Sequence, residues 1–270
     1  MMTPSMKSVV VQDLVVSYGE VEAVRGTSFS VGAGEVFGLL GPNGAGKTSV
    51  LRVLVALRRP QGGQAWVLGR EVTADPRAVR RVIGYVPQAL SADGSLTGRE
   101  NAFLFARLYG LEPRRRRARI DEVLGLMGLG PAADALVQTY SGGMVRRLEI
   151  ACALISSPRV LLLDEPTLGL DPGARRGVWE HLHRQRDESE MTILVTTHYM
   201  DEAQQHCDRV AVMSAGQVLA EDTPADLRAR LRPDATLEDV FIALTGTGLG
   251  EDKGGMREVA RTRRTARRLG

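Results

Sequence analysis

The chain has 270 residues, enough for one large domain or a core domain with a subdomain, and its 43% hydrophobic content allows a sizeable core. No run reaches about 18 apolar residues, the length of a membrane span, and the N-terminus lacks the apolar run of a secretory signal. The net charge is +3, but residues 253–270 alone carry +6, which leaves −3 for residues 1–252 and argues against a nucleic-acid-binding core.

Short apolar segments separated by turns predict several strands in the first 90 residues. Gly32–Glu35 is the turn between the second and third of these segments, and Arg58–Gln64 is a turn before the fourth. An apolar-periodic helix is expected at 49–57. The predicted strands are 9–19, 23–31, 35–41, 65–69 and 81–88.

Residues 41–48, GPNGAGKT, form the phosphate-binding pattern G-x-x-x-x-G-K-[ST] between a predicted strand and a predicted helix. Its glycines let backbone N–H groups converge on phosphate oxygens, and the positive end of the following helix faces the same anion. Lys47 would reach the β and γ phosphates, and the Thr48 hydroxyl would hold Mg²⁺. The pattern alone predicts binding of ATP or GTP. The predicted contacts are Gly41, Pro42, Asn43, Gly44, Ala45, Gly46, Lys47, Thr48 and Ser49.

Residues 98–157 change character and predict three helices, at 98–110, 114–128 and 142–157. The alternation of strands and helices then resumes with the continuously apolar segment Arg159–Pro166, typical of a strand buried on both faces of a sheet. The elements expected after it are a helix at 173–188, a strand at 192–198, a helix at 199–207, a hairpin turning at Ala215–Gly216, a short helix capped by Thr223 with Pro224 at its first position, and a closing segment at 236–246.

The apolar strand LLLDEP ends in two adjacent acids, as a phosphate-loop enzyme requires on its magnesium side. Asp164 is expected to hold the metal, and Glu165 is placed to polarise an attacking water as general base. Because successive strand residues point to opposite faces, the two acids have room for different roles.

YSGGM, residues 140–144, opens a helix with Ser141 as a natural N-cap. Gly142 and Gly143 leave the first N–H groups of this helix bare of side chains, which makes a second anion-binding helix end. One chain needs only one phosphate cradle, so the second end requires another phosphate.

The predicted fold is α/β, with a P-loop core built on a mostly parallel sheet, an antiparallel β-subdomain and an inserted helical subdomain. We expect one domain over 1–245, with its core at 1–87 and 158–245 and the helical subdomain at about 88–157. Residues 246–270 are expected to form a disordered basic tail.

The order GPNGAGKT, Gln88, YSGGM, LLLDEP, LGLD and a lone His198 resembles the nucleotide-binding subunit of ABC transporters over roughly residues 9–245. In that family the serine and glycines of the signature motif cap the ATP that is held by the phosphate loop of another subunit. The resemblance therefore implies a second copy of this chain, paired head to tail, so that the two copies enclose two ATPs.

The resemblance also suggests roles for single residues. Tyr18 is similar to the aromatic that stacks on adenine; the alternative is a strand-end tyrosine that packs on the core. Gln88 resembles the glutamine that reaches Mg²⁺ and the attacking water and links the site to the membrane partner. Asp171 resembles the aspartate of the loop joining the two sites, and His198 resembles the switch histidine at the γ-phosphate.

The signature departs from the family pattern at one position. Its usual terminal glutamine is Met144 here, and methionine forms no strong hydrogen bonds, so any contact of the glutamine is lost or replaced. Two basic runs, 114–117 and 257–268, have open interpretations. The first is a solvated helix face or a contact with anionic headgroups or the permease, and the second is a solubilising tail or a contact with the inner leaflet.

LTGRENAFLFARLYG, YSGGM, HYMDEA and TLEDVFIALTG look like the ATPase subunits of daunorubicin-type drug-resistance exporters. That resemblance implies ATP and Mg²⁺ as cofactors, a separate ABC-2 type permease as partner, residues 88–110 as the surface that meets it, and a peripheral location at the cytoplasmic face of the membrane. Two alternatives remain open. One is a soluble ABC-type ATPase acting on a macromolecule without a permease, and the other is a regulatory module that binds nucleotide without hydrolysis.

Overall fold

The computed structural model describes residues 7–246. The expected disordered tail therefore lies outside the described residues, except for Gly246. The strands are β1 (Lys7–Tyr18), β2 (Val21–Gly32), β3 (Val36–Leu40), β4 (Gly62–Val67), β5 (Arg70–Glu71), β6 (Ile83–Val86), β7 (Val160–Asp164), β8 (Thr192–Thr197), β9 (Arg209–Ser214) and β10 (Gln217–Asp222). The α-helices are α1 (Lys47–Leu54), α2 (Pro76–Arg80), α3 (Gly98–Leu108), α4 (Pro113–Leu126), α5 (Gly142–Leu154), α6 (Pro172–Ser189), α7 (Met200–His206), α8 (Pro224–Leu231) and α9 (Leu237–Thr245), with short 3₁₀ turns at Gly130–Ala132 and Val137–Thr139.

The strands and helices expected from the sequence are confirmed, with bounds that differ by a few residues, and the closing segment forms α9. Thr223 caps α8 through the Asp226 N–H, with Pro224 at the first position, as expected. The structure adds β5 and α2, which the sequence pattern did not predict. Only Val79 of α2 is buried, so this short helix has no apolar periodicity to reveal it.

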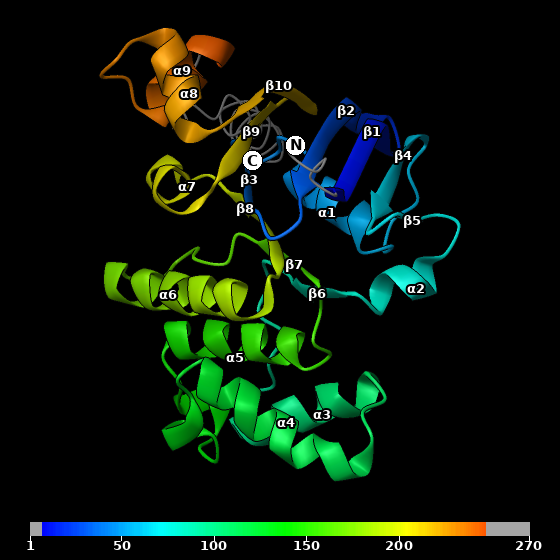
Figure 1. The fold of residues 1–270 in the computed structure, drawn as a ribbon, viewed down its shortest axis with the longest axis vertical. Coiled ribbons are helices and arrows are strands. Elements are labelled where there is room, and N and C mark those ends of the chain that lie inside the picture. Colours follow the sequence, from blue (N-terminus) through cyan, green and yellow to red (C-terminus); the bar gives the residue numbers. More distant parts are fainter. Residues whose placement is uncertain (1–6, 247–270) are drawn as a thin grey trace, which may run out of the picture.

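The strands form two sheets of different character. The central sheet has the order β10-β9-β3-β8-β7-β6, in which β9, β3, β8, β7 and β6 run parallel and β10 lies antiparallel at one edge. The second sheet, β2-β1-β4-β5, is antiparallel. Figure 1 shows this second sheet beside the central one, next to α1. The predicted α/β fold class is confirmed.

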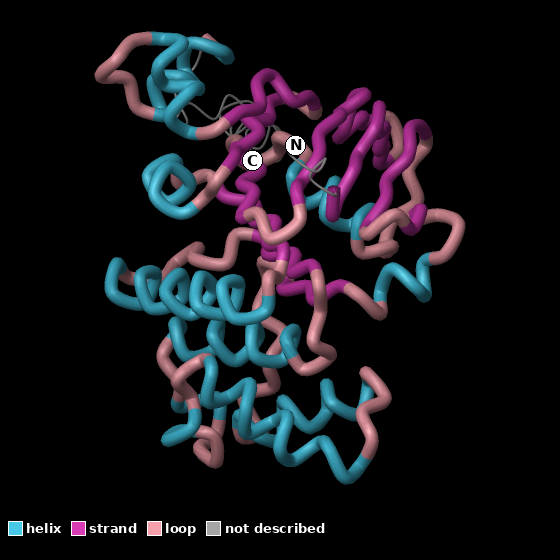
Figure 2. The backbone as a smooth tube through the Cα atoms, viewed as in Figure 1, coloured by secondary structure: helices cyan, strands magenta, loops and turns pink. Residues whose placement is uncertain are grey.

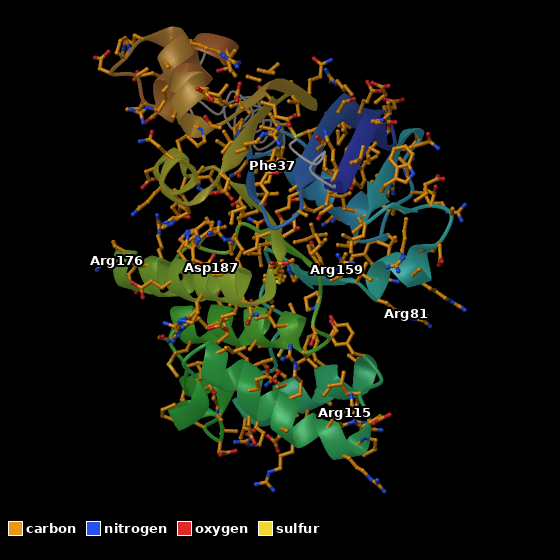
Figure 3. The ribbon with its side chains drawn as sticks, in the orientation of Figure 1. Phe37, Arg81, Arg115, Arg159, Arg176 and Asp187 are labelled. Atoms are coloured by element: carbon orange, nitrogen blue, oxygen red, sulfur yellow. The ribbon has the colours of Figure 1, made fainter. Side chains whose placement is uncertain are left out.

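The central strands are buried on both faces, and their alternating side chains divide between two hydrophobic cores. In β3, Val36 and Leu40 pack in the first core, whereas Phe37 and Leu39 pack in the second. The second core also holds apolar side chains of β1, β2, β4 and α1, so α1 is enclosed between the two sheets. Phe37 lies in this interior and stacks on Phe29 at a centroid distance of 5.5 Å (Figure 3).

The first core joins the opposite face of the central sheet to the helices. Helix α6 packs on α5, and α5 packs on α3 and α4, so successive rows of helix extend away from the sheet (Figures 1 and 2). Arg115 marks the far end of this helical region and points outward (Figure 3). The buried side of α5 therefore lies between the edge of the sheet and the outer helices.

Candidate nucleotide-binding site

The predicted phosphate loop connects the buried strand β3 to α1, and tight packing requires its glycines. Gly46 has φ 102°, and a Cβ there would lie 2.4 Å from the Ala23 carbonyl oxygen. A Cβ on Gly41 would lie 2.1 Å from the Met213 carbonyl oxygen. Both positions therefore exclude a side chain, since the loop backbone presses against β2 on one side and β9 on the other.

Lys47 is the buried cation of the site. Its Nζ donates to the carbonyl oxygens of Gly41 at 2.7 Å and Pro42 at 3.1 Å, and it lies 3.2 Å from Glu165 Oε1. Burial lowers the pKa of Lys47, and the charges of Glu165 and Asp164 partly oppose that shift. The ammonium therefore holds the loop and the end of β7 together.

Asp164 closes β7 with one paired and one unpaired carboxylate oxygen. Its Oδ1 accepts from Thr48 Oγ1 at 3.1 Å and from Thr196 Oγ1 at 2.7 Å. Its Oδ2 is buried, and no group within residues 7–246 forms a hydrogen bond with it. An unpaired buried carboxylate oxygen beside a threonine hydroxyl fits a small divalent cation, because Mg²⁺ prefers hard oxygen ligands and carboxylates. The residues present thus fit the predicted magnesium site.

Glu165 lies between Lys47 and His198. Its Oε2 is 3.1 Å from His198 Nδ1, while its Oε1 faces the Lys47 ammonium. The residue has φ 48°, a left-handed conformation that costs a non-glycine residue roughly 1–2 kcal/mol. Its N–H donates to both the carbonyl and the hydroxyl oxygen of Thr196, which holds this conformation in place.

A cavity of about 500 Å³ opens over the phosphate loop. The predicted residues that line it are Asn43, Gly44, Ala45, Gly46, Lys47, Thr48, Ser49, Gln88 and Glu165. The sequence interpretation missed the opposite wall, formed by Val21, Glu22, Ala23, Arg25 and Ala215. Hydrogen bonds explain this wall, since the Gly216 N–H donates to the Ala45 carbonyl and the Arg25 N–H donates to the Gly216 carbonyl. No motif marks a hairpin turn for such a contact.

Tyr18 lies beside this cavity without lining it. Its hydroxyl is 3.4 Å from Ser49 Oγ, and the Arg58 guanidinium lies 4.5 Å from the centre of its ring. Burial alone would raise the pKa of Tyr18, but hydrogen bonds from Ser49 and Arg52 and the nearby arginine charges lower it. Tyr18 is 37% exposed, which leaves part of the side chain open to solvent.

The signature residues lie on a different surface. Ser141 caps α5 by accepting the Met144 N–H at 3.3 Å, and Asp171 caps α6 by accepting the Ala174 N–H at 2.9 Å. None of Ser141, Gly142, Gly143 and Asp171 lines the cavity over the phosphate loop. The structure thus brings Gln88, Glu165 and the phosphate loop together. The N-terminus of α5 with Ser141, Gly142 and Gly143, hereafter called the signature end, lies apart from them. The Met144 side chain is half-buried and packs against the first core.

Two general properties complete the description of the chain. Among residues 7–246, no helix combines the length and the apolar character that crossing a membrane requires. Residues 24–168 match the ABC transporter family.

Known proteins of similar sequence are ATP-binding subunits. The daunorubicin/doxorubicin resistance ATP-binding protein DrrA of Streptomyces peucetius is 46% identical over 231 residues, covering 86% of this chain and 70% of the relative. The Nod factor export ATP-binding protein I of Rhizobium sp. (strain N33) is 46% identical over 208 residues, covering 77% of this chain and 68% of that protein.

Solved structures give the same result. An ATP-binding subunit of an ABC transporter superposes with a TM-score of 0.77 at 29% identity, covering 88% of this chain and 99% of the other. A dimeric ATP-binding cassette with ADP and phosphate, in a post-hydrolysis state, gives a TM-score of 0.71 at 26% identity, with 80% and 98% coverage. The chain therefore belongs to the ABC transporter family, as one of its ATPase subunits.

Proposed function

We propose that this chain hydrolyses ATP with Mg²⁺ as one of two head-to-tail copies and drives export of a hydrophobic, drug-like compound through a separate ABC-2 type permease. The observation that carries the proposal is that Lys47 and Glu165 line the cavity with their charged atoms 3.2 Å apart. Asp164 lies directly behind this lining, where it accepts a hydrogen bond from Thr48. Cation, metal-side acid and candidate base lie where a phosphate-loop ATPase needs them.

The contacts of Lys47 suggest how binding prepares hydrolysis. Lys47 lies 3.2 Å from Glu165 Oε1, one of the two oxygens available to accept a proton from water. Phosphate oxygens attract the Lys47 ammonium away from this carboxylate and from the loop carbonyls. Glu165 then keeps its contact with His198 and has Oε1 free to act as general base.

The magnesium-side residues have separate tasks in this proposal. Thr48, Gln88 and Asp164 would hold the cation, which neutralises phosphate charge when it is bound. The unpaired Asp164 Oδ2 supports this assignment. Tyr18 would take the adenine, with its ring held in place by Arg58 on one side.

The signature end supports pairing of two copies. Ser141 and Gly142 are exposed, and the first two residues of α5 are glycines that carry no side chain of their own. This helix end is an anion site without an anion in its own chain, so the phosphate would come with the second copy. The solved dimeric relative supports such pairing, and Asp171 lies on the same surface.

The permease would meet residues 88–110. Leu90, Phe103, Leu104 and Leu108 are all exposed there, with Leu108 79% exposed. Such a group of apolar side chains is typical of a protein-protein contact. In this proposal the chain has a core at 1–87 and 158–245 and a helical subdomain at about 88–157, which would carry this surface. The protein would then sit at the cytoplasmic face of the membrane, bound to its permease.

Two measurements test the proposal. We expect the purified chain to hydrolyse ATP, and Glu165→Gln to remove that activity while ATP binding persists. Fractionation of cells with and without a candidate permease tests the transport role, and we expect membrane association and lower drug accumulation only with the permease. A protein that is fully functional with no permease present contradicts export and favours an ATPase that acts on a macromolecule.

A further inference from the structure

Helix α5 contains a buried ion pair shortly after its exposed N-terminal signature. Arg146 and Glu149 are only 3% and 5% exposed, and Arg146 Nη1 lies 3.0 Å from Glu149 Oε2. Burial lowers the pKa of Arg146, and the charge of Glu149 opposes that shift. Removing two charges from water is costly, and a buried pair is often no more stable than two packed apolar side chains. Stability alone therefore gives little reason for this pair.

The remaining polar atoms of the pair bind one short segment, 87–91. Arg146 donates from Nη1 to the Pro87 carbonyl at 2.8 Å and from Nη2 to the Gln88 carbonyl at 3.0 Å. Glu149 Oε1 accepts from the Ser91 N–H at 2.5 Å and from the Ser91 hydroxyl at 3.1 Å. A guanidinium suits this task, since its rigid fork contacts two consecutive carbonyls at once.

These contacts are the main attachment of the segment. Within residues 7–246, the segment 87–91 makes no hydrogen bond to protein groups other than Arg146 and Glu149. Its Gln88 side chain lines the cavity over the phosphate loop. One helix thus presents Ser141 at its exposed end and holds the backbone of Gln88 from its buried side.

We propose that Arg146 and Glu149 are positioning residues for hydrolysis: they hold Gln88 at the cavity and transmit any displacement of α5 to it. This inference rests on the proposed ATPase function. When a second copy presents phosphate at Ser141, any movement of α5 reaches Gln88 through the side chains of Arg146 and Glu149. The position of Gln88 in one copy therefore responds to the nucleotide held by the other copy, which Ser141 of the first copy contacts.

The experiment uses the full chain and compares Arg146→Lys with Arg119→Lys. Arg119 is a matched control, because it also pairs with a glutamate three residues on and donates to two consecutive carbonyls, those of Leu154 and Ile155, away from the cavity. We expect Arg146→Lys to speed hydrogen exchange of the Ser91 amide about tenfold, since the loop loses a charge-assisted bond. Arg119→Lys leaves Ser91 exchange unchanged.

Hydrolysis separates positioning from folding. We expect Arg146→Lys to lower kcat about tenfold while the Kd for ATP, measured without Mg²⁺, stays within about twofold, because the phosphate loop holds the phosphates and Gln88 contributes only to the cation and the attacking water. In a Gln88→Ala background, Arg146→Lys should cause no further loss of kcat, because the side chain that Arg146 positions is then absent. The double variant Arg146→Met/Glu149→Leu removes both charges, should remain folded, and should lose kcat to the same extent.

The outcomes are distinct. Unchanged Ser91 exchange in Arg146→Lys, unchanged kcat in a folded Arg146→Met/Glu149→Leu, or a full additional loss in the Gln88→Ala background each overturns the inference. The unmodified chain is assayed first. Absence of hydrolysis there contradicts the proposed function and the catalytic part of this inference. Hydrogen exchange of the Ser91 amide still tests whether Arg146 and Glu149 hold the segment 87–91 in place.

Discussion

The cavity over the phosphate loop and the exposed N-terminal ends of α5 and α6 are the two regions proposed to act on nucleotide, and they are built differently. At the cavity, Lys47 and Asp164 are buried and already held by partners within the chain. At the other end, the Ser141 and Asp171 side chains accept hydrogen bonds from the first turns of their own helices and, among the residues that the structure describes, from no other group. The first region is therefore held by contacts between buried groups of one chain, whereas the second exposes Ser141 and Gly142 at its surface.

This difference predicts how substitutions divide. Changes at the cavity should alter what a single chain does with nucleotide. Changes at the signature end should leave the single chain intact and alter what two chains do together.

Glu165→Gln should lower kcat by about 100- to 1,000-fold, because the amide cannot accept the proton of the attacking water. ATP binding should persist, and paired chains should accumulate with ATP, as seen by size-exclusion chromatography. Single-turnover measurement gives the rate. Steady-state hydrolysis that survives this substitution contradicts the role of Glu165.

Lys47→Ala should weaken ATP binding by about 100-fold, since it removes the buried cation and its charge-assisted contacts to phosphate. Isothermal titration calorimetry measures the change. Lys7→Ala is the control, because Lys7 contacts Ser30 and lines a different cavity. Equal losses in both variants would mean that the cavity over the phosphate loop is not the site.

Gly142→Asp should lower ATP-dependent pairing by about tenfold or more, because it adds a negative charge at a helix end that is expected to meet phosphate. A Cβ fits there, since its nearest neighbour is a Leu170 methyl at 3.6 Å. The Kd of the single chain for ATP should not change, and light scattering reports the pairing. A folded variant that no longer binds ATP would contradict the expectation that this region acts only between two chains.

Met144→Gln should tighten pairing by only about threefold, by adding one hydrogen-bonding group at the signature end. The same substitution should lower the stability of the folded chain, because Met144 is half-buried and a polar side chain there replaces apolar contacts with the first core. Thermal unfolding and pairing are measured together. A lower melting temperature with unchanged pairing would show that methionine serves packing alone.

ATP affinity should decline at high pH sooner than an ordinary lysine would allow. Burial lowers the pKa of Lys47, so its charge is lost at a pH below 10.5, and only the charged form attracts phosphate. Glu165 opposes this shift, so Glu165→Gln should move the decline to still lower pH. Titration of affinity against pH checks both directions, and an unshifted profile in Glu165→Gln contradicts the coupling.

Local signals in the sequence were sufficient for most of the fold. Continuous apolar runs marked β3 and β7, and Thr223 with Pro224 marked the start of α8. The short helix α2 escaped because a polar segment has no periodicity, although Asp75 caps it and Pro76 occupies its first turn. Both signals were present, but each is also common in turns.

The candidate site divides in the same way. The phosphate loop and the acids after β7 follow from motifs, because each depends on residues adjacent in the chain. Ala215 in the cavity wall and the burial of Arg146 with Glu149 depend on which elements pack together. An arginine and a glutamate three residues apart on a helix are usually solvated, so sequence spacing gave no reason to expect an interior pair.

The contact between Gly216 and the phosphate loop also affects the order in which the protein can become functional. Synthesis proceeds at about 5–20 residues per second, so the ribosome reaches Gly216 on the order of ten seconds after Thr48. Until then the loop lacks the neighbour that accepts the Arg25 N–H and donates to Ala45. We therefore expect nucleotide to stabilise chains elongated past this turn more than products that end before it.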